Sequence, residues 1–420
     1  MDREELLFVG ICDLAGHLRG KAFPAVDWPN RLTKGVGYTH SNIMMSAFGP
    51  IYRSHFGTAG DLVILPDPST RVDVAFGQGA GEHFCLGDLR TLDGAAWKCC
   101  PRDFLRRGLA ALAEMGMQLL ATFEQEFVYT GVEARPGRTY ALDSLRQAGV
   151  FGEAVVAALR AAGVTPDSFL PEYGERQFEV TVTPTLGLRA ADEAVIVREM
   201  VRAVAHRLGE RAIFAPMIQP EGVGNGTHVH FSLRRLSGEP ATYDAASVDR
   251  MTPEARHFVA GVLHHMPALC ALTAPSVASY QRLTPNRWAP VRADLGTQDR
   301  GSAVRICPVS ATSPESVARQ FNVEYRVADA TASPYMVLGA IAHAGAYGIR
   351  RGLRLPDSAA APLLPRSLDA ALDALEADAQ APSWLGPDLL KAYVMLKRDE
   401  IAALEGRDAA AVCARYVEVY

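Results

Sequence analysis

Carboxylate and imidazole side chains recur on one side of several short apolar segments of this chain. In ATFEQEFVYTG (residues 121–131), Glu124 and Glu126 alternate with aromatic and other bulky residues. Successive side chains of a strand point to opposite faces, so the two carboxylates would share a face, about 7 Å apart along the chain. Crowded carboxylates raise each other's pKa unless a cation lies between them. The segment therefore predicts a strand whose polar face binds a cation.

Four more segments show the same one-sided pattern. Their polar faces carry Gln177, Glu179 and Thr181, then His228, His230 and Ser232, then Arg305, then Glu324 and Arg326. An antiparallel sheet with one solvated face gives the same alternation. Solvated faces usually carry lysine, however, and lysine is absent from all five polar faces. Enclosed Glu, His and Arg are rarely left unpaired. We therefore expect one concave sheet that lines a polar cavity.

The types of these side chains indicate what the cavity binds. An oxygen-rich set suits Mg²⁺ or Mn²⁺, and its lack of sulfur argues against structural zinc. The candidate ligands are Glu124, Glu126, Glu172, Glu179, Glu324 and His228. Arginine complements them because guanidinium binds phosphate through two parallel hydrogen bonds and keeps its charge. Metal and arginine on one surface supply the charge neutralisation and positioning that transfer of a nucleotide γ-phosphate requires.

The common nucleotide and hydrolase motifs are absent. GHLRGKA (residues 16–22) is one residue short of a Walker A spacing and lacks the final Ser or Thr. GVGNGTH (residues 222–228) has alternate glycines without a G-x-G-x-x-G register, which favours a turn where a ligand approaches the backbone. Neither H-E-x-x-H nor G-x-S-x-G occurs. A zinc protease and a serine hydrolase of the usual kinds are therefore disfavoured.

Composition sets the broad class. The chain has 420 residues, of which 49% are hydrophobic, enough for a large core and two or three domains. Its formal net charge of −5 argues against a nucleic-acid partner. Seven scattered cysteines without a Cys-x-x-Cys spacing are typical of buried thiols in a reducing compartment. With no apolar run long enough to span a membrane and a poor secretory signal, we expect a soluble cytoplasmic protein.

The elements that would position these residues fall into two groups. Residues 5–13 read as a strand, strands and loops continue through residues 59–70, and a helix begins near Pro101. We place a domain boundary there, giving domains 1–95 and 96–420. Further helices are expected at 142–162, 189–209, 251–271, 312–320 and 386–416, with a loop and a surface helix within 355–382. This succession indicates an α+β fold rather than regular βαβ units.

Several motifs, in the same order along the chain, resemble those of the glutamine synthetase family. They are CDLAGHLRGKAFP, GDLVILPDPST, FEQEFVY, PEYGERQFEV, GNGTHVHFSL, SYQRLTPNRWAP, DRGSAVRI and VEYRVADATASPYM. The resemblance implies a small β-grasp amino-terminal domain and a catalytic domain whose curved antiparallel sheet lines a funnel flanked by helices. It also implies homo-oligomers, hexameric rings or dodecamers, with active sites between subunits.

The resemblance also assigns roles by position. Glu126, Glu172 and Glu179 would hold the metal ion nearer the acyl substrate, and Glu124, His228 and Glu324 the ion nearer the phosphates. Arg300 and Arg305 would contact the nucleotide phosphates, Arg282 a substrate carboxylate, Arg326 the transferred phosphoryl group, and Gly224 the acyl substrate through its backbone. His230 and Ser232 lie where the family contacts nucleotide. The implied cofactors are ATP and two or more Mg²⁺ or Mn²⁺ ions.

The implied reaction is an ATP-dependent ligation of a carboxylate to an amine. The γ-phosphate of ATP passes to a side-chain carboxylate, which gives an acyl phosphate, and an amine then displaces phosphate to form an amide. Rival interpretations are a non-catalytic scaffold, a guanidino phosphotransferase and a metal-dependent amide hydrolase. The complete ligand set disfavours the scaffold, and RLTPNRWAP followed by DRGSAVRI favours the ligase.

Three departures from the family pattern concern the amine and the acyl donor. Trp288 stands where glutamine synthetases have a glutamate that helps bind ammonium, and the region around His40 lacks the family's aspartate. Tryptophan packs against alkyl or aryl groups or lies under a cation. We therefore expect an organic amine and a γ-glutamyl amide product, with an ammonia-using enzyme as the alternative. Val223 replaces an asparagine that contacts the amino group of glutamate, so the acyl donor stays open.

Overall fold

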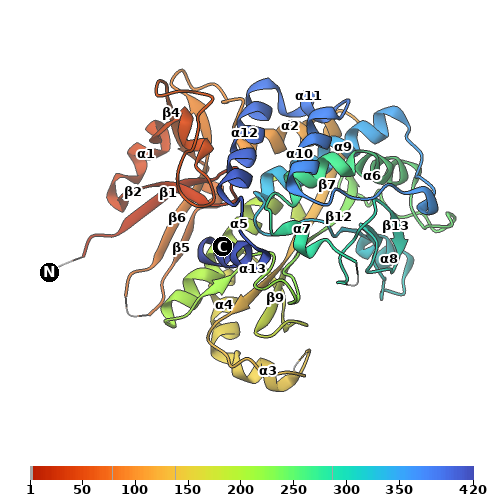
Figure 1. Cartoon of the computed structure of the whole chain (residues 1–420), viewed down its shortest axis with the longest axis horizontal. Helices are drawn as coiled ribbons and strands as arrows, with labels where there is room; N and C mark the ends of the chain where they lie inside the picture. The colour runs from red at the N-terminus through yellow and green to blue at the C-terminus, as the bar shows by residue number, and fades with distance from the viewer. Residues whose placement is uncertain (1–2, 78, 138, 286) are drawn as a thin grey trace.

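Two β-sheets organise the chain, and helices pack around the second of them (Figure 1). The computed structural model describes residues 3–77, 79–137, 139–285 and 287–420, except for the side chain of residue 359. The arrangement is α+β, as predicted. No helix within these described residues is long and apolar enough to cross a membrane.

The amino-terminal sheet has the β-grasp arrangement that was expected. Its strand order is β2-β1-β6-β4-β3, with β5 paired to β6. The central strands β1 and β6 are parallel, and the other pairs are antiparallel. The strands are β1 (Leu6–Cys12), β2 (Leu18–Pro24), β3 (Val36–Thr39), β4 (Asp61–Pro66), β5 (Val72–Val74) and β6 (Glu82–Thr91), and helix α1 is Trp28–Lys34. We propose that the domain boundary lies near residue 95, after β6.

The larger sheet is strongly curved. Its order is β13-β14-β15-β12-β7-β9-β8, with β10 and β11 also paired to β7. The strands are β7 (Met117–Tyr129), β8 (Pro166–Pro171), β9 (Gln177–Val182), β10 (Thr185–Leu186), β11 (Ala212–Ile213), β12 (Thr227–Arg235), β13 (Leu295–Thr297), β14 (Val304–Ile306) and β15 (Val323–Tyr325). Every pair is antiparallel except β13–β14, which is parallel. The long central strand β7 therefore has neighbours on both sides that can present side chains to one face.

Helices surround this sheet and agree broadly with the expected spans. They are α2 (Pro101–Ala113), α3 (Leu142–Gln147), α4 (Gly149–Ala161), α5 (Leu188–Arg207), α6 (Pro253–Thr273), α7 (Ser279–Arg282), α8 (Pro314–Gln320), α9 (Pro334–Arg351), α10 (Leu368–Ala377), α11 (Ala381–Leu385), α12 (Pro387–Ala403) and α13 (Ala409–Val419). The helix expected at 142–162 is divided at Ala148. The expected surface helix, α10, is half buried because Leu368, Leu372 and Leu375 are covered by neighbouring helices.

Helix α9 was not predicted from the sequence. It is buried from Pro334 to Ala346 and carries charged residues only at its carboxyl end, Arg350 and Arg351. Glycines permit its close packing against α2 and α6. A Cβ at Gly348 would lie 2.1 Å from the carbonyl oxygen of His257, and one at Gly339 would lie 2.6 Å from the Phe104 ring.

Arg102 joins the amino-terminal sheet to the helices. Its guanidinium contacts Asp88 of β6 and Asp67 of the loop after β4, each at 2.9 Å, and pairs with Asp192 of α5 at 2.9 Å and 3.0 Å. The hydroxyl of Tyr335 donates to Asp192 at 2.6 Å. Arg102 is 1% exposed. One buried cation therefore links three carboxylates that come from both parts of the chain.

Helix α12, blue in Figure 1, lies beside the amino-terminal domain. Asp399 of this helix pairs with Arg53, and Asp388 pairs with Lys98 and, at 3.1 Å, with His55. The final third of the chain is thus also in contact with the loop between β3 and β4 of the amino-terminal domain.

Candidate active site

The polar faces of five strands meet on the concave side of the larger sheet. Glu126 lies opposite Glu179 of β9, and Glu124 lies opposite His228 of β12. Glu324 of β15 is flanked by His230 on one side and Arg305 of β14 on the other. The polar and apolar side chains therefore alternate along the folded strands as the sequence predicted. The apolar side chains of these strands form the core on the opposite face of the sheet.

Two adjoining cavities occupy this concave side. The larger cavity has a volume of about 940 Å³. The residues predicted from the sequence that line it are Glu124, Glu126, Glu172, Glu179, Gly224, His228, Arg282, Trp288, Arg300 and Arg326. The second is about 490 Å³, shares Glu124 and Glu179, and is also lined by His230 and Ser232. Arg305 and Glu324 line neither cavity and lie behind them, where Glu324 is 1% exposed. The structure thus brings the predicted residues into one region.

Glu124 is the centre of the acidic and imidazole group. Its carboxylate lies 3.2 Å from Nδ1 of His228 and 2.9 Å from Nε2 of His230. Nδ1 of His228 is also 3.5 Å from Glu324 and 3.8 Å from Glu126. Single donor atoms of Glu124, Glu179 and His228 all lie within 4.8 Å of one another. Such spacing suits ligands of one ion or of two neighbouring ions.

The pKa values in this group show that its carboxylates crowd one another. Burial, followed by the charges of Glu124, Glu126 and Glu172, raises the pKa of Glu179 to about 10. Burial and the charge of Glu126 also raise the pKa of Glu172. A divalent cation would relieve both effects by favouring the ionised carboxylates. The oxygen-rich donor set therefore fits Mg²⁺ or Mn²⁺.

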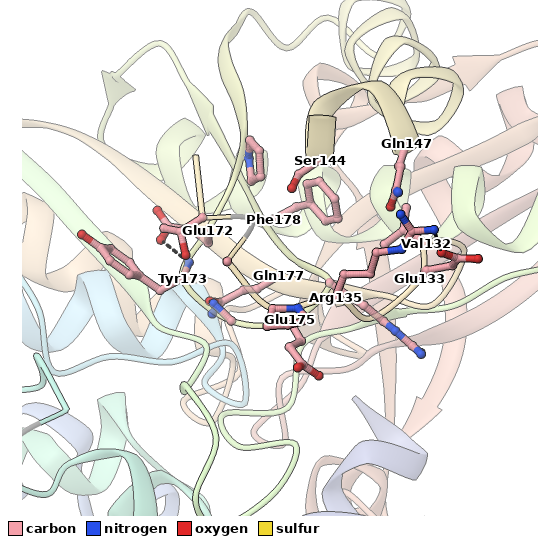
Figure 2. A pocket seen from close by; sticks show the side chains of 16 residues that line it. Val132, Glu133, Arg135, Ser144, Gln147, Glu172, Tyr173, Glu175, Gln177 and Phe178 are labelled. Carbon is pink, nitrogen blue, oxygen red and sulfur yellow. Dashed lines mark hydrogen bonds and ion pairs between the residues drawn. The ribbon is translucent and has the colours of Figure 1, made fainter. Parts of the chain in front are cut away.

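Glu172 lies at the end of β8 and is held in place by two neighbours. The hydroxyl of Tyr140 donates to Oε1 at 2.9 Å, and the backbone N–H of Tyr173 donates to Oε2 at 3.1 Å. Figure 2 shows Glu172 and Tyr173 at one end of a separate small pocket of about 130 Å³, with Glu133 and Arg135 at the other end. Glu172 also lines the larger cavity, so the β8–β9 loop separates the two spaces.

The glycine turn before β12 is fixed by contacts that the sequence did not predict. Gln177 donates to the carbonyl oxygen of Gly224 at 2.9 Å and to the side chain of Asn225 at 2.8 Å. The backbone N–H of Gly226 donates to Glu126 at 2.6 Å. A Cβ at Gly224 would lie 2.6 Å from Cγ of Arg282. The turn therefore needs glycine because the Arg282 side chain packs on it, in addition to any approach by substrate.

The arginines are held by carboxylates and backbone carbonyls. Arg326 contacts Glu324 and donates to the carbonyl oxygens of Arg300 at 3.1 Å and Trp288 at 3.4 Å. Arg305 lies 2.9 Å from Glu324 as an ion pair without a directed hydrogen bond. Arg282 donates to Ala328 at 2.8 Å and to Val327, and its burial lowers its pKa. These guanidinium groups lie beside the carboxylates, as phosphoryl transfer requires.

Aromatic side chains form one wall of the larger cavity. The ring centroid of Trp288 lies 5.5 Å from that of Tyr173, which lies 5.4 Å from that of Tyr140. Trp288 is 64% exposed and has a positive φ of 55°, an uncommon conformation for a bulky residue. Its motif also contains Asn286, which lies outside the described residues. The two tyrosines were not predicted as site residues, because nothing in their sequence context marks them.

His40, considered from the sequence as a possible base, packs elsewhere. Its ring stacks on Trp97 with centroids 5.4 Å apart, and it lines neither of the two cavities. Val223 lines the larger cavity and is 47% exposed.

Family models match both parts of the chain. The glutamine synthetase N-terminal domain matches residues 2–97, and the glutamine synthetase catalytic domain matches residues 98–416. The chain belongs to the glutamine synthetase family. It is an ATP-dependent ligase of this family, whose enzymes use ATP together with divalent metal ions.

Individual relatives in the glutamine synthetase family carry different names. The gamma-glutamylpolyamine synthetase GlnA3 of Streptomyces coelicolor is 36% identical over 383 residues, which cover 85% of this chain and 80% of that protein. A glutamine synthetase of Thermococcus kodakarensis is 29% identical over 366 residues, which cover 85% of this chain and 76% of that protein. A solved chain described as a novel glutamine synthase homolog is 39% identical. Its TM-score is 0.96, and the match covers 100% of this chain and 99% of that chain. A solved GmaS/ADP complex is 26% identical. Its TM-score is 0.82, and the match covers 96% of this chain and 95% of that chain.

Proposed function

We propose that this ligase joins the γ-carboxylate of glutamate to an organic amine through an acyl-phosphate intermediate. The observation that carries the proposal is the aromatic wall of Trp288, Tyr173 and Tyr140 in the larger cavity. An indole ring in place of a carboxylate removes an ion-pairing partner for ammonium and adds apolar surface for an alkyl or aryl group. The same rings attract a cation that lies within about 6 Å of their faces.

The proposed roles follow from the contacts in the cavity. Glu126, Glu172 and Glu179 would hold one divalent ion, and Glu124, His228 and Glu324 a second. Bound ions would neutralise charge on the nucleotide phosphates. Arg300 and Arg305 would bind the phosphates, Arg326 would bind the transferred phosphoryl group, and His230 and Ser232 would contact the nucleotide. Each arginine supplies fixed hydrogen-bond donors to an anion whose charge is spread over several oxygens.

The acyl donor would bind beside the glycine turn. Arg282 lines the larger cavity and packs on Gly224, so its guanidinium and the backbone of the turn lie together. A carboxylate on the donor would pair with this buried cation. Val223 offers no hydrogen bond from its side chain to the α-amino group of glutamate. We therefore extend the experiment below to donors without that amino group.

A glutamine synthetase that uses ammonia is the second candidate, because relatives with that name match most of the chain. A screen of carboxylates against ammonia, alkylamines, polyamines and arylamines distinguishes the two. The measurements are ATP-dependent phosphate release and the mass of the amide product. We expect at least one organic amine to exceed ammonia in kcat/KM. Equal or better turnover with ammonia would overturn the amine proposal.

Replacing Trp288 by glutamate should shift this preference. We expect kcat/KM for the best organic amine to fall by about 10- to 100-fold, since apolar pocket contacts are worth roughly 1–3 kcal/mol. Ammonia should be used relatively better because a carboxylate again pairs with ammonium. Trp288→Phe is the matched control and should keep most activity with the organic amine. The same preference in both variants would show that Trp288 only fills its loop.

We also propose that the ligase forms hexameric rings or dodecamers with active sites between subunits. Val26, Ile51 and Tyr52 of the amino-terminal domain are exposed, and a subunit interface would cover such residues. Light scattering of the purified protein should give six or twelve times the chain mass of 45.3 kDa. A mass near that of a single chain would contradict the proposal.

A further inference from the structure

A buried thiol, that of Cys307, lies beside two of the predicted site residues, His230 and Glu324. Cys307 follows β14, and its backbone N–H donates to Asn322 at 3.1 Å, which extends the pairing of β14 with β15. Because side chains alternate along this segment, Cys307 lies on the same face as Arg305. Its Sγ is 3.5 Å from Nδ1 of His230 and 3.9 Å from Oε2 of Glu324. Cys307 is 6% exposed.

The three side chains have the donor types and spacing of a transition-metal site. One ligand atom from each of His230, Cys307 and Glu324 lies within 4.8 Å of the others. Tetrahedral zinc binds nitrogen, oxygen and sulfur at about 2.0–2.3 Å, which places its ligands about 3.3–3.8 Å apart. The observed separations of 3.5 Å and 3.9 Å are close to this range. Thiolate and imidazole suit zinc, whereas Mg²⁺ takes oxygen ligands.

We propose that His230, Cys307 and Glu324 form a further metal site, selective for Zn²⁺ and chemically similar ions, which shares Glu324 with the proposed magnesium ligands. Binding would displace the Cys307 proton to water and leave a metal-bound thiolate. The sequence-based ligand set, which is poor in sulfur, did not include Cys307. Nδ1 of His230 lies 2.8 Å from Oδ1 of Asn322, within hydrogen-bond distance, so a bound zinc ion would replace that contact.

Occupancy of this site would oppose ligase activity. Glu324 also lies 3.5 Å from His228 and 2.9 Å from Arg305, and it contacts Arg326. An ion at the thiol would draw Glu324 away from these partners. Bound zinc would then disturb the residues proposed to contact the nucleotide phosphates, even when magnesium is in excess. This consequence for activity rests on the proposed function, whereas the binding itself does not.

A cobalt titration tests the binding directly. Co²⁺ added to the full-length protein should produce a near-ultraviolet thiolate-to-cobalt charge-transfer band, and added Zn²⁺ should remove it. Cys307→Ser should lose the band. Cys413→Ser is the matched control, because serine can keep the bond that Sγ of Cys413 donates to Gln281 at 3.0 Å. Absence of the band in the unaltered protein, or its persistence in Cys307→Ser, would overturn the proposal.

The effect on activity provides a second measurement. With Mg²⁺ in excess, Zn²⁺ should inhibit ATP-dependent phosphate release by the unaltered protein at lower concentration than it inhibits Cys307→Ala. Turnover of Cys307→Ala with Mg²⁺ alone shows that the variant is folded. Identical zinc sensitivity in the two proteins would contradict a role for the thiol. If no carboxylate and amine pair is turned over, the proposed function fails, and the cobalt spectrum still decides the metal site.

Discussion

Replacement of Arg326 by alanine is expected to lower kcat for amide formation by about 10³-fold, in the range found for arginines that stabilise transferring phosphoryl groups. Arg326 lines the larger cavity, and its guanidinium is oriented by Glu324 and by the carbonyl oxygens of Arg300 and Trp288. A group held by three partners needs no reorganisation when charge develops on the phosphoryl oxygens. The measurement is phosphate release at saturating ATP, donor and amine.

Lysine at the same position tests geometry against charge. Arg326→Lys keeps the positive charge but cannot contact Glu324 and two carbonyl oxygens through one planar fork. We expect it to recover only a small part of the lost kcat. Arg415→Ala on α13 is the control, because this arginine pairs with Glu418 one turn away and lines neither cavity. Near-normal kcat in Arg326→Ala would remove this residue from the proposed phosphoryl site.

Replacement of Arg102 by alanine should lower the free energy of unfolding by about 3–5 kcal/mol, the usual cost of removing one partner from a buried ion pair. The variant would leave Asp67, Asp88 and Asp192 facing one another without their shared cation. Arg106 still contacts Asp88 but, among these three carboxylates, pairs with that one alone. The decrease in the free energy of unfolding should therefore be large, and the packing of the amino-terminal domain against the helices should weaken.

Denaturant unfolding at one protomer concentration measures this effect, since oligomerisation makes stability depend on concentration. Arg160→Ala on the exposed face of α4 serves as the control and should change stability by less than about 0.5 kcal/mol. A similarly small change in Arg102→Ala would show that the network contributes little beyond its desolvation cost.

The sequence predicted the sheet and most of the candidate site because strand alternation is a local property. Glu124, Glu126, Glu179 and His228 follow the two-residue period, and the fold places them on one concave face as that period requires. Their roles as ligands stay predictions. Helix α9 was not predicted, and its only charged residues, Arg350 and Arg351, lie at its carboxyl end.

Residues brought together only by the tertiary fold could not be found from the sequence. Tyr140 and Tyr173 come from different segments and meet Trp288 across the larger cavity. Gln177 was placed on the polar face, but its bond to Asn225 depends on how the glycine turn packs against β9. Cys307 follows a strand of only three residues, so its pairing with Asn322 was not visible in the alternation.

The aromatic wall and the carboxylate group stand on different kinds of backbone. Tyr173 and Trp288 belong to the segments that follow β8 and α7, whereas Glu124, Glu179 and His228 project from paired strands. Loops tolerate exchange far better than sheet positions do. We therefore expect acceptor preference to change on grafting these two short segments, provided that the graft keeps the Trp288 carbonyl that orients Arg326 and the Tyr173 N–H that holds Glu172. Such grafts would make the chain a practical starting point for engineered amide synthesis.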